Sequence, residues 1–232
     1  MRFIYSNLTF FLKKHAEHLP IETYLCFMLI TLHPDNPQPR ELSRVIELLK
    51  QDGVIIIPTD TVYAFACDAH NLKAIEQICR IKGIKSEKAN FSLLCKDLKN
   101  LSEYTAHFER NVYRLVNQSL PGPYTFIFKA NSNVPKIFKN SRKKEIGIRV
   151  PDNPIVQALL EQFGHPLVAT SLHGSDSFED YLIEPEDMEE KFGHMVAAVI
   201  DGGLGGIVPS TVIDCSGDEP LLVREGKGEV IL

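Results

Sequence analysis

The chain has 232 residues, of which 44% are hydrophobic and 24% charged, with 14 glycines, 14 prolines and no tryptophan. This composition is typical of globular proteins and excludes collagenous, low-complexity and intrinsically disordered chains. The 25 basic and 30 acidic side chains give a net charge of −5, so any contact with RNA must be confined to a local basic patch. The longest apolar run near the N-terminus, residues 25–30, is much shorter than the roughly 20 residues of a membrane helix.

Residues 1–27 contain scattered phenylalanines without a repeat or a convincing helix cap, and their lysines follow the apolar start, unlike those of a signal peptide. We therefore expect a dispensable N-terminal extension followed by one domain over residues 28–232; the alternative is a helix that lies on a membrane surface. The five cysteines are widely spaced, odd in number and form no CxxC pair. This pattern favours buried, reduced thiols in a cytoplasmic protein. They are Cys26, Cys67, Cys79, Cys95 and Cys215.

From Met28 onward, helical and strand-like segments alternate. Apolar periodicity and turn residues predict helices over residues 39–51, 71–81, 97–104, 109–119, 153–163 and 185–192. Strands are predicted over residues 54–57, 92–95, 124–129, 146–150, 167–171, 197–200, 211–214 and 221–224. In the second helix Leu72, Ile75 and Ile78 should point inward, whereas the helix over 185–192 reads as acidic and exposed. The pattern indicates an α/β or α+β sheet protein with a single core.

Three polar or glycine-rich segments follow predicted elements, where sheet proteins place ligand sites. Residues 58–63 (PTDTVY) are either pocket-lining or a turn in which hydroxyls bind nearby backbone. Residues 82–88 (KGIKSEK) are either a polyphosphate grip or a solvated helix end. Residues 201–206 (DGGLGG), followed by Pro-Ser-Thr at 209–211, form either a loop that approaches a nucleotide or a plain connection.

Standard catalytic motifs are absent, since the chain has neither GxSxG nor HExxH. His70, His107, His165 and His173 lie too far apart along the chain to indicate a metal cluster, and we expect no protein-bound metal site. Local signals alone therefore predict an α/β domain that binds a ligand.

Taken in order, the segments are more specific: HPDNPQ, GVIIIPTDTVYAFACDA, NFSLLCKDL, PGPYTFIFK, IGIRVPDNP, PLVATSLHGSD and VPSTVIDCSGDEPLLVREG. They resemble the YrdC-like family, the threonylcarbamoyl-AMP synthase fold, over nearly all of residues 32–232, and are most similar to its YciO branch. The resemblance implies a twisted mixed sheet flanked by helices around a large, positively lined concave cavity. It also implies a reaction in which L-threonine, bicarbonate and ATP, with Mg²⁺, yield threonylcarbamoyl-AMP and pyrophosphate, for modification of the adenosine beside the anticodon of tRNA (t6A).

Residue roles follow from the matched positions. By resemblance, the side of the site that holds threonine comprises Thr59, Thr61, Tyr63, Thr125 and Arg149.

Lys82 matches the first cation of the family's KxR phosphate grip and is a catalytic candidate with Lys85, while Lys85 or Lys88 supplies a second cation. The other residues that the resemblance places near the nucleotide are Ser171, His173, Ser210, Thr211 and Arg224.

The chain departs from the synthase pattern in three positions. Ile84 stands where the family has the Arg of KxR, His173 replaces the Asn of SxN, and Ala64 replaces the Gly after Tyr63. Loss of a guanidinium removes a bidentate phosphate contact that lysine does not reproduce. These changes indicate either a weaker synthase or a shifted substrate, such as another carbamate.

A non-catalytic protein that binds tRNA or double-stranded RNA is the competing interpretation. It rests on a basic stretch in an otherwise acidic chain, which would neutralise several phosphates. The alternative is an exposed loop without a partner. The stretch comprises Lys136, Lys139, Arg142, Lys143 and Lys144.

Overall fold

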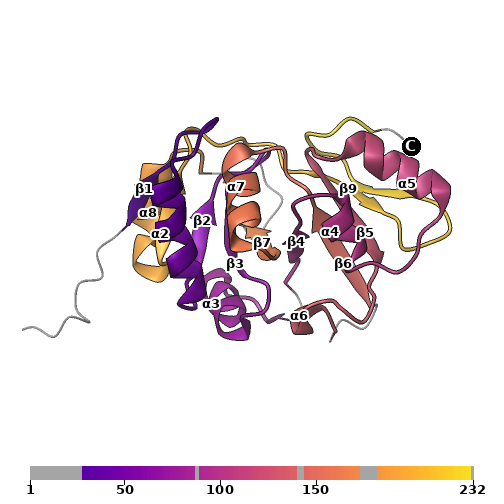
Figure 1. The fold of residues 1–232 in the computed structure, drawn as a ribbon, viewed down its shortest axis with the longest axis horizontal. Coiled ribbons are helices and arrows are strands. Elements are labelled where there is room, and N and C mark those ends of the chain that lie inside the picture. Colours follow the sequence, from indigo (N-terminus) through magenta and orange to yellow (C-terminus); the bar gives the residue numbers. More distant parts are fainter. Residues whose placement is uncertain (1–27, 87–88, 140–143, 173–181, 231–232) are drawn as a thin grey trace, which may run out of the picture.

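The computed structural model describes residues 28–86, 89–139, 144–172 and 182–230 (Figure 1). The strands are β1 (Leu29–Thr31), β2 (Ile55–Ile57), β3 (Ala64–Asp68), β4 (Ser92–Leu94), β5 (Tyr124–Lys129), β6 (Glu145–Arg149), β7 (Leu167–Ser171), β8 (Ala198–Asp201), β9 (Thr211–Asp214) and β10 (Leu221–Arg224). The helices are α2 (Pro39–Lys50), α3 (Leu72–Lys82), α4 (Leu98–Ser102), α5 (Arg110–Ser119), α6 (Lys136–Lys139), α7 (Pro154–Phe163) and α8 (Pro185–Phe192). The predicted extension 1–27 lies outside the described residues, so the proposed boundary at residue 28 stays a prediction.

Among the described residues, ten strands form one mixed sheet in the order β1-β8-β2-β3-β7-β4-β6-β5-β9-β10. The sheet contains parallel pairs such as β2–β8 and β5–β9 and antiparallel pairs such as β3–β7 and β5–β6. The predicted mixed α/β class is therefore confirmed. Of the helices in the described ranges, none combines the length and apolarity needed to cross a bilayer; the expected cytoplasmic location stays a prediction.

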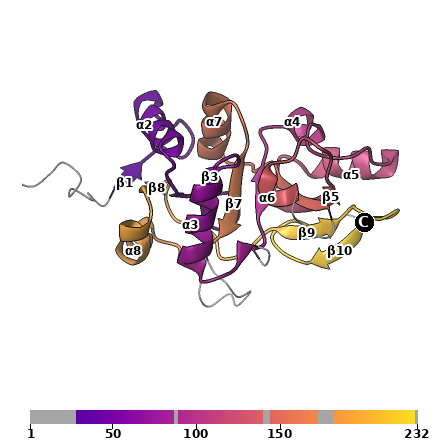
Figure 2. The same cartoon turned by 90° about the horizontal axis from the view of Figure 1, so that it is seen from below.

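Side-chain alternation along the central strands builds two apolar clusters, one on each face of the sheet. Ile55 and Ile57 pack beneath α2 and α7, whereas Ile56 and Phe65 face the cluster that contains α3 and α8. The two helix pairs lie on opposite sides of the strands (Figure 2). Because both faces are covered, the central strands have near-continuous apolar sequences instead of an apolar–polar alternation.

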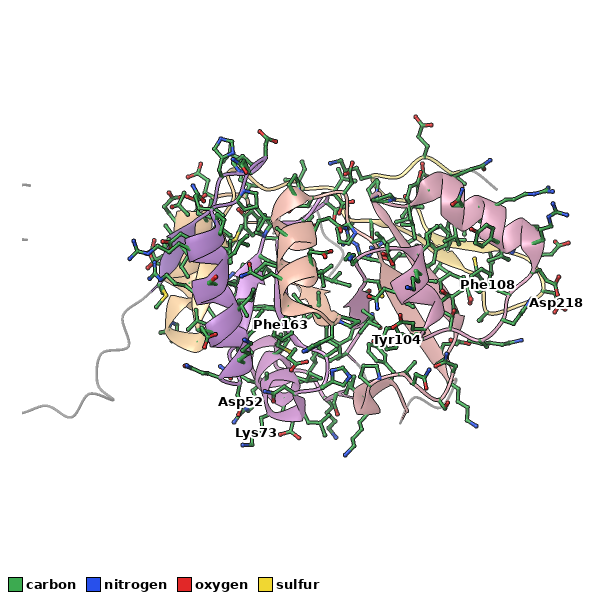
Figure 3. The ribbon with its side chains drawn as sticks, in the orientation of Figure 1. Asp52, Lys73, Tyr104, Phe108, Phe163 and Asp218 are labelled. Carbon is green, nitrogen blue, oxygen red and sulfur yellow. The ribbon has the colours of Figure 1, made fainter. Side chains whose placement is uncertain are left out.

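Local capping residues set the bounds of the helices that flank the candidate site. The Asn71 side chain accepts hydrogen bonds from the first turn of α3, and Gly83 ends the helix in the left-handed region with φ of 64°. Nearby on the surface, Lys73 Nζ lies 3.7 Å from Asp52 Oδ2 (Figure 3). In the same way, Asn153 caps α7 and Gly164, with φ of 85°, ends it.

Several sequence expectations differ from the structure. Leu72 is 42% exposed instead of buried, because Ala74 takes the inward position in the first turn of α3. Helix α8 is not exposed all round: Met188 and Phe192 are buried, and the Phe192 ring meets Phe65 edge-on at 5.2 Å. Strands β1 and β3 and helix α6 were not predicted. The apolar residues that end the PTDTVY segment, Val62 and Tyr63, run directly into β3. The sequence therefore carries no signal for where this strand starts.

The predicted burial of the cysteines is confirmed for the described residues. Cys67, Cys95 and Cys215 are buried free thiols, and Cys79 is buried as well, while Cys26 lies outside the described residues. Burial raises the pKa of the Cys67, Cys95 and Cys215 thiols, so they stay protonated and unreactive at neutral pH.

Candidate functional site

The segment 58–63 between β2 and β3 is a compact turn stabilised by its own hydroxyls. Thr59 Oγ1 donates to the Val62 carbonyl at 2.7 Å and lies 3.0 Å from Thr61 Oγ1. The Thr61 amide donates to Thr59 Oγ1 at 3.1 Å. The turn interpretation is therefore correct for the local structure, and it holds the two predicted threonine-side hydroxyls next to each other.

Glycines of the 201–206 loop allow that loop to pack directly on this turn. A Cβ placed on Gly206 would lie 2.1 Å from the Thr61 carbonyl oxygen, and one on Gly205 would lie 2.6 Å from the Tyr63 ring. A larger residue at Gly206 would require the backbone to move, and one at Gly205 would require the Tyr63 ring to shift. The glycine-rich segment, which sequence left as either a nucleotide loop or a plain connection, thus forms part of the same assembly as residues 59–63.

The Tyr63 hydroxyl joins the turn to this loop. It donates to the Gly203 carbonyl at 2.7 Å and accepts from the Gly202 amide at 3.2 Å. Burial raises the pKa of Tyr63 to about 12, so the phenol is neutral at physiological pH. In this structure the hydroxyl fixes the glycine-rich loop; its predicted contact with threonine stays a prediction.

Arg149, at the end of β6, is the electrostatic centre of the cluster. Its Nη2 atom lies 2.6 Å from Asp60 Oδ1 and donates to Thr61 Oγ1 at 3.0 Å. The guanidinium is buried, and its Nε atom has no hydrogen-bond partner in the part of the chain that the structure describes. Burial lowers the pKa of Arg149, Asp60 opposes that shift, and the nearby charge of Arg224 lowers the pKa further.

Ser210, Thr125 and Arg224 form the adjoining part of the cluster. Thr125 Oγ1 lies 2.7 Å from Ser210 Oγ, and both side chains are buried. Arg224 Nη2 donates to the Ser210 carbonyl at 2.9 Å, and its charge acts on Arg149. Strand pairing brings the groups on β5, β6, β9 and β10 together, because β5 pairs with β9 and β6, and β9 pairs with β10. The 58–63 turn joins them through the contact between Arg149 and Asp60. Residues predicted separately from five distant motifs therefore converge.

The C-terminal segment closes this assembly. The buried Thr211 hydroxyl donates to the Gly228 carbonyl at 2.6 Å and accepts from the Gly226 amide at 3.0 Å. Thr211 therefore holds the backbone of residues 226–228 in place. Lys227 Nζ donates to the Asp60 carbonyl at 2.6 Å, which connects the C-terminal segment to the 58–63 turn.

Lys82 contacts the strand that pairs with the residue after the 58–63 segment. From the end of α3 its Nζ donates to the Ser171 carbonyl, and Ser171 pairs with Ala64, the residue that follows the turn. Burial lowers the pKa of Lys82 to about 8. Lys82 thus contacts β7, whereas Arg224 contacts the segment before β9. The shared phosphate cavity between them, which the resemblance implied, stays a prediction.

Comparisons with known proteins identify the family of this chain. The model of the Sua5/YciO/YrdC family, described as "Telomere recombination", matches residues 47–226. The chain belongs to this family. The protein named YciO of Escherichia coli K12 is 44% identical over 202 residues, covering 86% of this chain and 95% of that protein.

A further relative and two solved structures are also similar to this chain. A protein of Vibrio vulnificus named threonylcarbamoyl-AMP synthase is 30% identical over 188 residues, covering 80% of this chain and 98% of that protein. Among solved structures, E. coli YciO superposes with a TM-score of 0.80 at 41% identity over 87% of this chain and 97% of that chain. P. abyssi Sua5 complexed with L-threonine gives a TM-score of 0.76 at 22% identity, over 86% of this chain and 57% of that chain, and supports the fold alone.

One departure from the synthase pattern has a structural explanation. The Ala64 side chain belongs to the apolar cluster beneath α2 and α7 and is 5% exposed. The extra methyl group therefore fills core space and does not enter the polar cluster around Arg149. Ile84 follows the left-handed Gly83 at the end of α3, and the next residue, Lys85, is exposed. Lys88 and His173 lie outside the described residues.

The basic stretch is described only in part. Lys136 and Lys144 are exposed, Lys139 ends α6, and Arg142 and Lys143 lie outside the described residues. The RNA patch stays a prediction.

Sequence reasoning missed Asp60 and Lys227, and it was wrong to treat all the histidines as separated. Asp60 sits inside the quoted PTDTVY segment, but no sequence signal paired it with Arg149, 89 residues away. The fold also brings His70 and His165 together beside Asp68, because β3 and β7 are neighbouring strands.

Proposed function

We propose that this chain is an ATP-dependent nucleotidyltransferase that converts L-threonine, bicarbonate and ATP into threonylcarbamoyl-AMP and pyrophosphate, which feeds t6A modification of tRNA. The observation that carries the proposal is the buried guanidinium of Arg149. It bridges Asp60 and Thr61 within electrostatic reach of Arg224. Two neighbouring guanidinium groups favour an anionic substrate, here a carboxylate or a phosphate.

The reaction needs positioning more than a covalent intermediate. The threonine amine adds to CO₂ derived from bicarbonate, forming the N–C bond of a carbamate and releasing a proton. A carbamate oxygen then attacks the α-phosphorus of ATP in line, and the bond to the bridging oxygen of the β-phosphate breaks, so pyrophosphate leaves. Fixed donors that meet the developing charge lower such a barrier by several kcal/mol.

Under this proposal the two halves of the cluster have different roles. Thr59, Thr61 and Arg149 hold the amino acid, because their hydroxyls and guanidinium suit its hydroxyl and carboxylate. Ser210 and Arg224 bind the nucleotide from the adjoining side.

Lys82, which already donates to the Ser171 carbonyl, would turn toward the phosphates. Mg²⁺ would bind here mainly through the phosphates of ATP. The protein offers it few ligands, because the Asp60 carboxylate is paired with Arg149 and the neighbouring Thr61, Thr125 and Ser210 contribute only hydroxyls.

The test is pyrophosphate release from ATP by the purified full chain, measured with threonine and bicarbonate together and with each omitted. The proposal expects release that requires both, that falls at least tenfold in Arg149→Lys, and that is unchanged in Lys73→Met, an exposed lysine paired with Asp52. No release with any amino acid, or release independent of threonine, would refute the proposal.

A non-catalytic protein that binds tRNA or double-stranded RNA is the second candidate. The exposed Lys136 and Lys144, at the two ends of the basic stretch 136–144, favour it. Its distinguishing result is salt-dependent RNA binding without any amino-acid-dependent release of pyrophosphate.

A further inference from the structure

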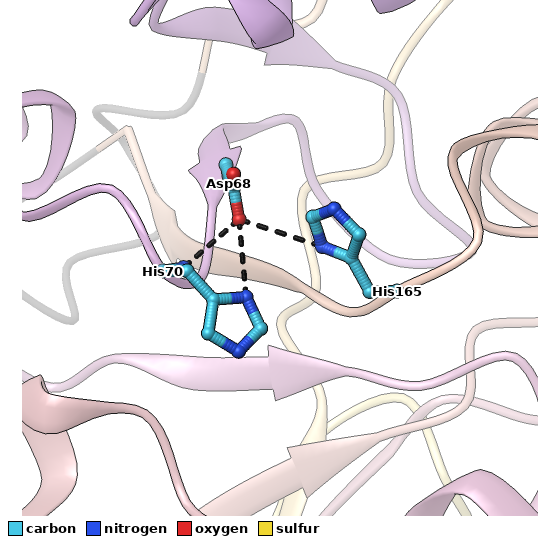
Figure 4. Close-up of side chains that lie close together, drawn as sticks. All are labelled: Asp68, His70 and His165. Carbon is cyan, nitrogen blue, oxygen red and sulfur yellow. Dashed lines mark hydrogen bonds and ion pairs between the residues drawn. The ribbon is translucent and has the colours of Figure 1, made fainter.

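Three side chains from separate segments converge at the far end of β3. Asp68 ends that strand, His70 lies in the turn before α3, and His165 lies in the loop between α7 and β7 (Figure 4). Among the described residues they form a group whose potential metal-binding atoms all lie within 4.8 Å of one another. Asp68 Oδ1 is 3.4 Å from His70 Nδ1 and 3.4 Å from His165 Nδ1.

The convergence follows from the backbone and is not a chance meeting of long side chains. Asp68 pairs with Leu167 in the antiparallel β3–β7 ladder, and the same register, continued by two residues, places His165 opposite His70, with their rings 5.3 Å apart between centroids. Gly164 turns the chain at the end of α7, and the ring of His165 packs on Phe163 at 4.0 Å between centroids. Phe163 is the last residue of α7 (Figure 3). The His165 imidazole is therefore held in place before any ligand arrives.

One buried nitrogen of the group lacks a hydrogen-bond partner among the described residues. His165 Nδ1 is a buried atom that lacks a hydrogen-bond partner in the described structure, although the Asp68 carboxylate is 3.4 Å away. The His70 amide donates to the same Asp68 oxygen at 2.9 Å, which orients the carboxylate. Buried imidazole nitrogens are normally satisfied, so this atom points to a missing partner between His165 and Asp68.

Two of the three separations between these atoms match a divalent transition-metal ion, and the ligand atoms of the two imidazoles lie within 4.8 Å of each other. In a tetrahedral site with bonds of about 2.0–2.1 Å, neighbouring ligand atoms are about 3.3–3.4 Å apart. The two distances from Asp68 Oδ1 to the histidine nitrogens have this value. Two imidazoles with one carboxylate favour Zn²⁺ and its neighbours in the first transition row over Mg²⁺ or Ca²⁺, which prefer oxygen ligands.

We propose that Asp68, His70 and His165 form a binding site for a divalent transition-metal ion, with Zn²⁺ as the test cation. Three protein ligands leave the fourth position to water, and the exposed side chain of His70 gives the ion access from solvent. The bound ion links the end of β3 and the turn after it to the α7–β7 loop. Because Asp68 lies at the opposite end of β3 from Ala64, about 13 Å from the turn at 58–63, this site is distinct from the proposed synthase site.

The experiment is a calorimetric titration of the untagged, chelator-stripped full chain with ZnCl₂, together with thermal unfolding with and without the metal. We expect about one equivalent bound at this site, a Zn²⁺-dependent rise in the unfolding temperature, and no such rise with Mg²⁺. His70→Ala and His165→Ala should each weaken binding at least tenfold. His107→Ala, which removes an exposed histidine elsewhere, should leave binding unchanged.

The double variant His70→Ala/His165→Ala separates this site from any other in the chain, including one formed by histidines outside the described residues. Loss of one equivalent and of the thermal shift in this variant supports the proposal. An unchanged isotherm in the double variant, or no Zn²⁺ binding by the unmodified chain, overturns it. If the alanine variants fold poorly by circular dichroism, Asp68→Asn provides the same test, because the amide keeps the shape but lacks the charge that holds a metal.

Discussion

Arg149 and Asp60, 89 residues apart in the chain, form a buried ion pair in which Nη2 lies 2.6 Å from Oδ1. The pair anchors the 58–63 turn to the end of β6 and so holds Thr61 beside Arg149. An ion pair removed from water stabilises a fold only while both partners are present, since either one alone is an uncompensated buried charge.

Arg149→Met should therefore destabilise the chain by about 3–5 kcal/mol, measured by urea denaturation. Asp60→Asn should also destabilise it, and the double variant should be less destabilised than the sum of the two, because each single change strands the other charge. Lys96→Met, which breaks a surface ion pair with Glu161, is the matched control and should leave stability unchanged. Strict additivity of the Arg149 and Asp60 effects would contradict this account.

Lys82 gives a pH signature. Its pKa is about 8 in the folded chain, below the ordinary lysine value of 10.5, because burial disfavours the charge. Between about pH 8 and 10.5 the unfolded chain binds more protons at this position than the folded chain, so folding stability rises with pH in that window. Compared with Lys82→Met, the unmodified chain should thus gain unfolding temperature from pH 8 to pH 10. A constant difference between the two proteins would show that burial does not shift this group.

The exposed Lys85 is the control for that experiment. The unfolding temperature of Lys85→Met should follow that of the unmodified chain across the whole pH range.

Under the proposed function Lys82→Met also weakens ATP binding, and ATP binding by the unmodified chain should weaken as pH rises above 8, because the neutral amine no longer attracts phosphate. These two readouts separate the structural effect of Lys82 from its proposed role.

Ala64→Gly tests whether this departure from the synthase pattern affects the site. We expect a loss of about 1–2 kcal/mol in unfolding free energy, from a lost buried methyl group and a more flexible chain, with no change in the rate of pyrophosphate release. Ala66, on the same face of β3 and fully buried, is the matched control, and Ala66→Gly should behave alike. A faster reaction in Ala64→Gly alone would show that the methyl group obstructs the substrate.

The basic stretch 136–144 can be tested by charge reversal. Changing Arg142, Lys143 and Lys144 to glutamate should weaken binding of double-stranded RNA at least tenfold and flatten its dependence on salt, measured by fluorescence anisotropy. Reversal of Lys50 and Lys73, exposed lysines elsewhere, is the control. Equal RNA affinity in both sets of variants would eliminate the patch.

Sequence predicted the fold well because most of its signals are local. Helix α3, for example, has an apolar stripe, the cap Asn71 and the stop Gly83, all within one segment. The site was harder, because its decisive contacts join distant segments. Nothing in the PTDTVY segment indicates that Asp60 pairs with Arg149, and no spacing rule brings His165 to Asp68. The β3–β7 register brings His165 near Asp68, and the ion pair joins a turn to the end of β6, so both contacts become visible only in the assembled sheet.

The most direct test of the central claim is to incubate the chain with ATP labelled at the α-phosphorus and threonine labelled at carbon, with bicarbonate present. The account predicts one product that carries both labels, formed together with pyrophosphate and lost when bicarbonate is removed or when Arg149 is changed to lysine. Labels that stay in separate molecules under all these conditions would contradict it.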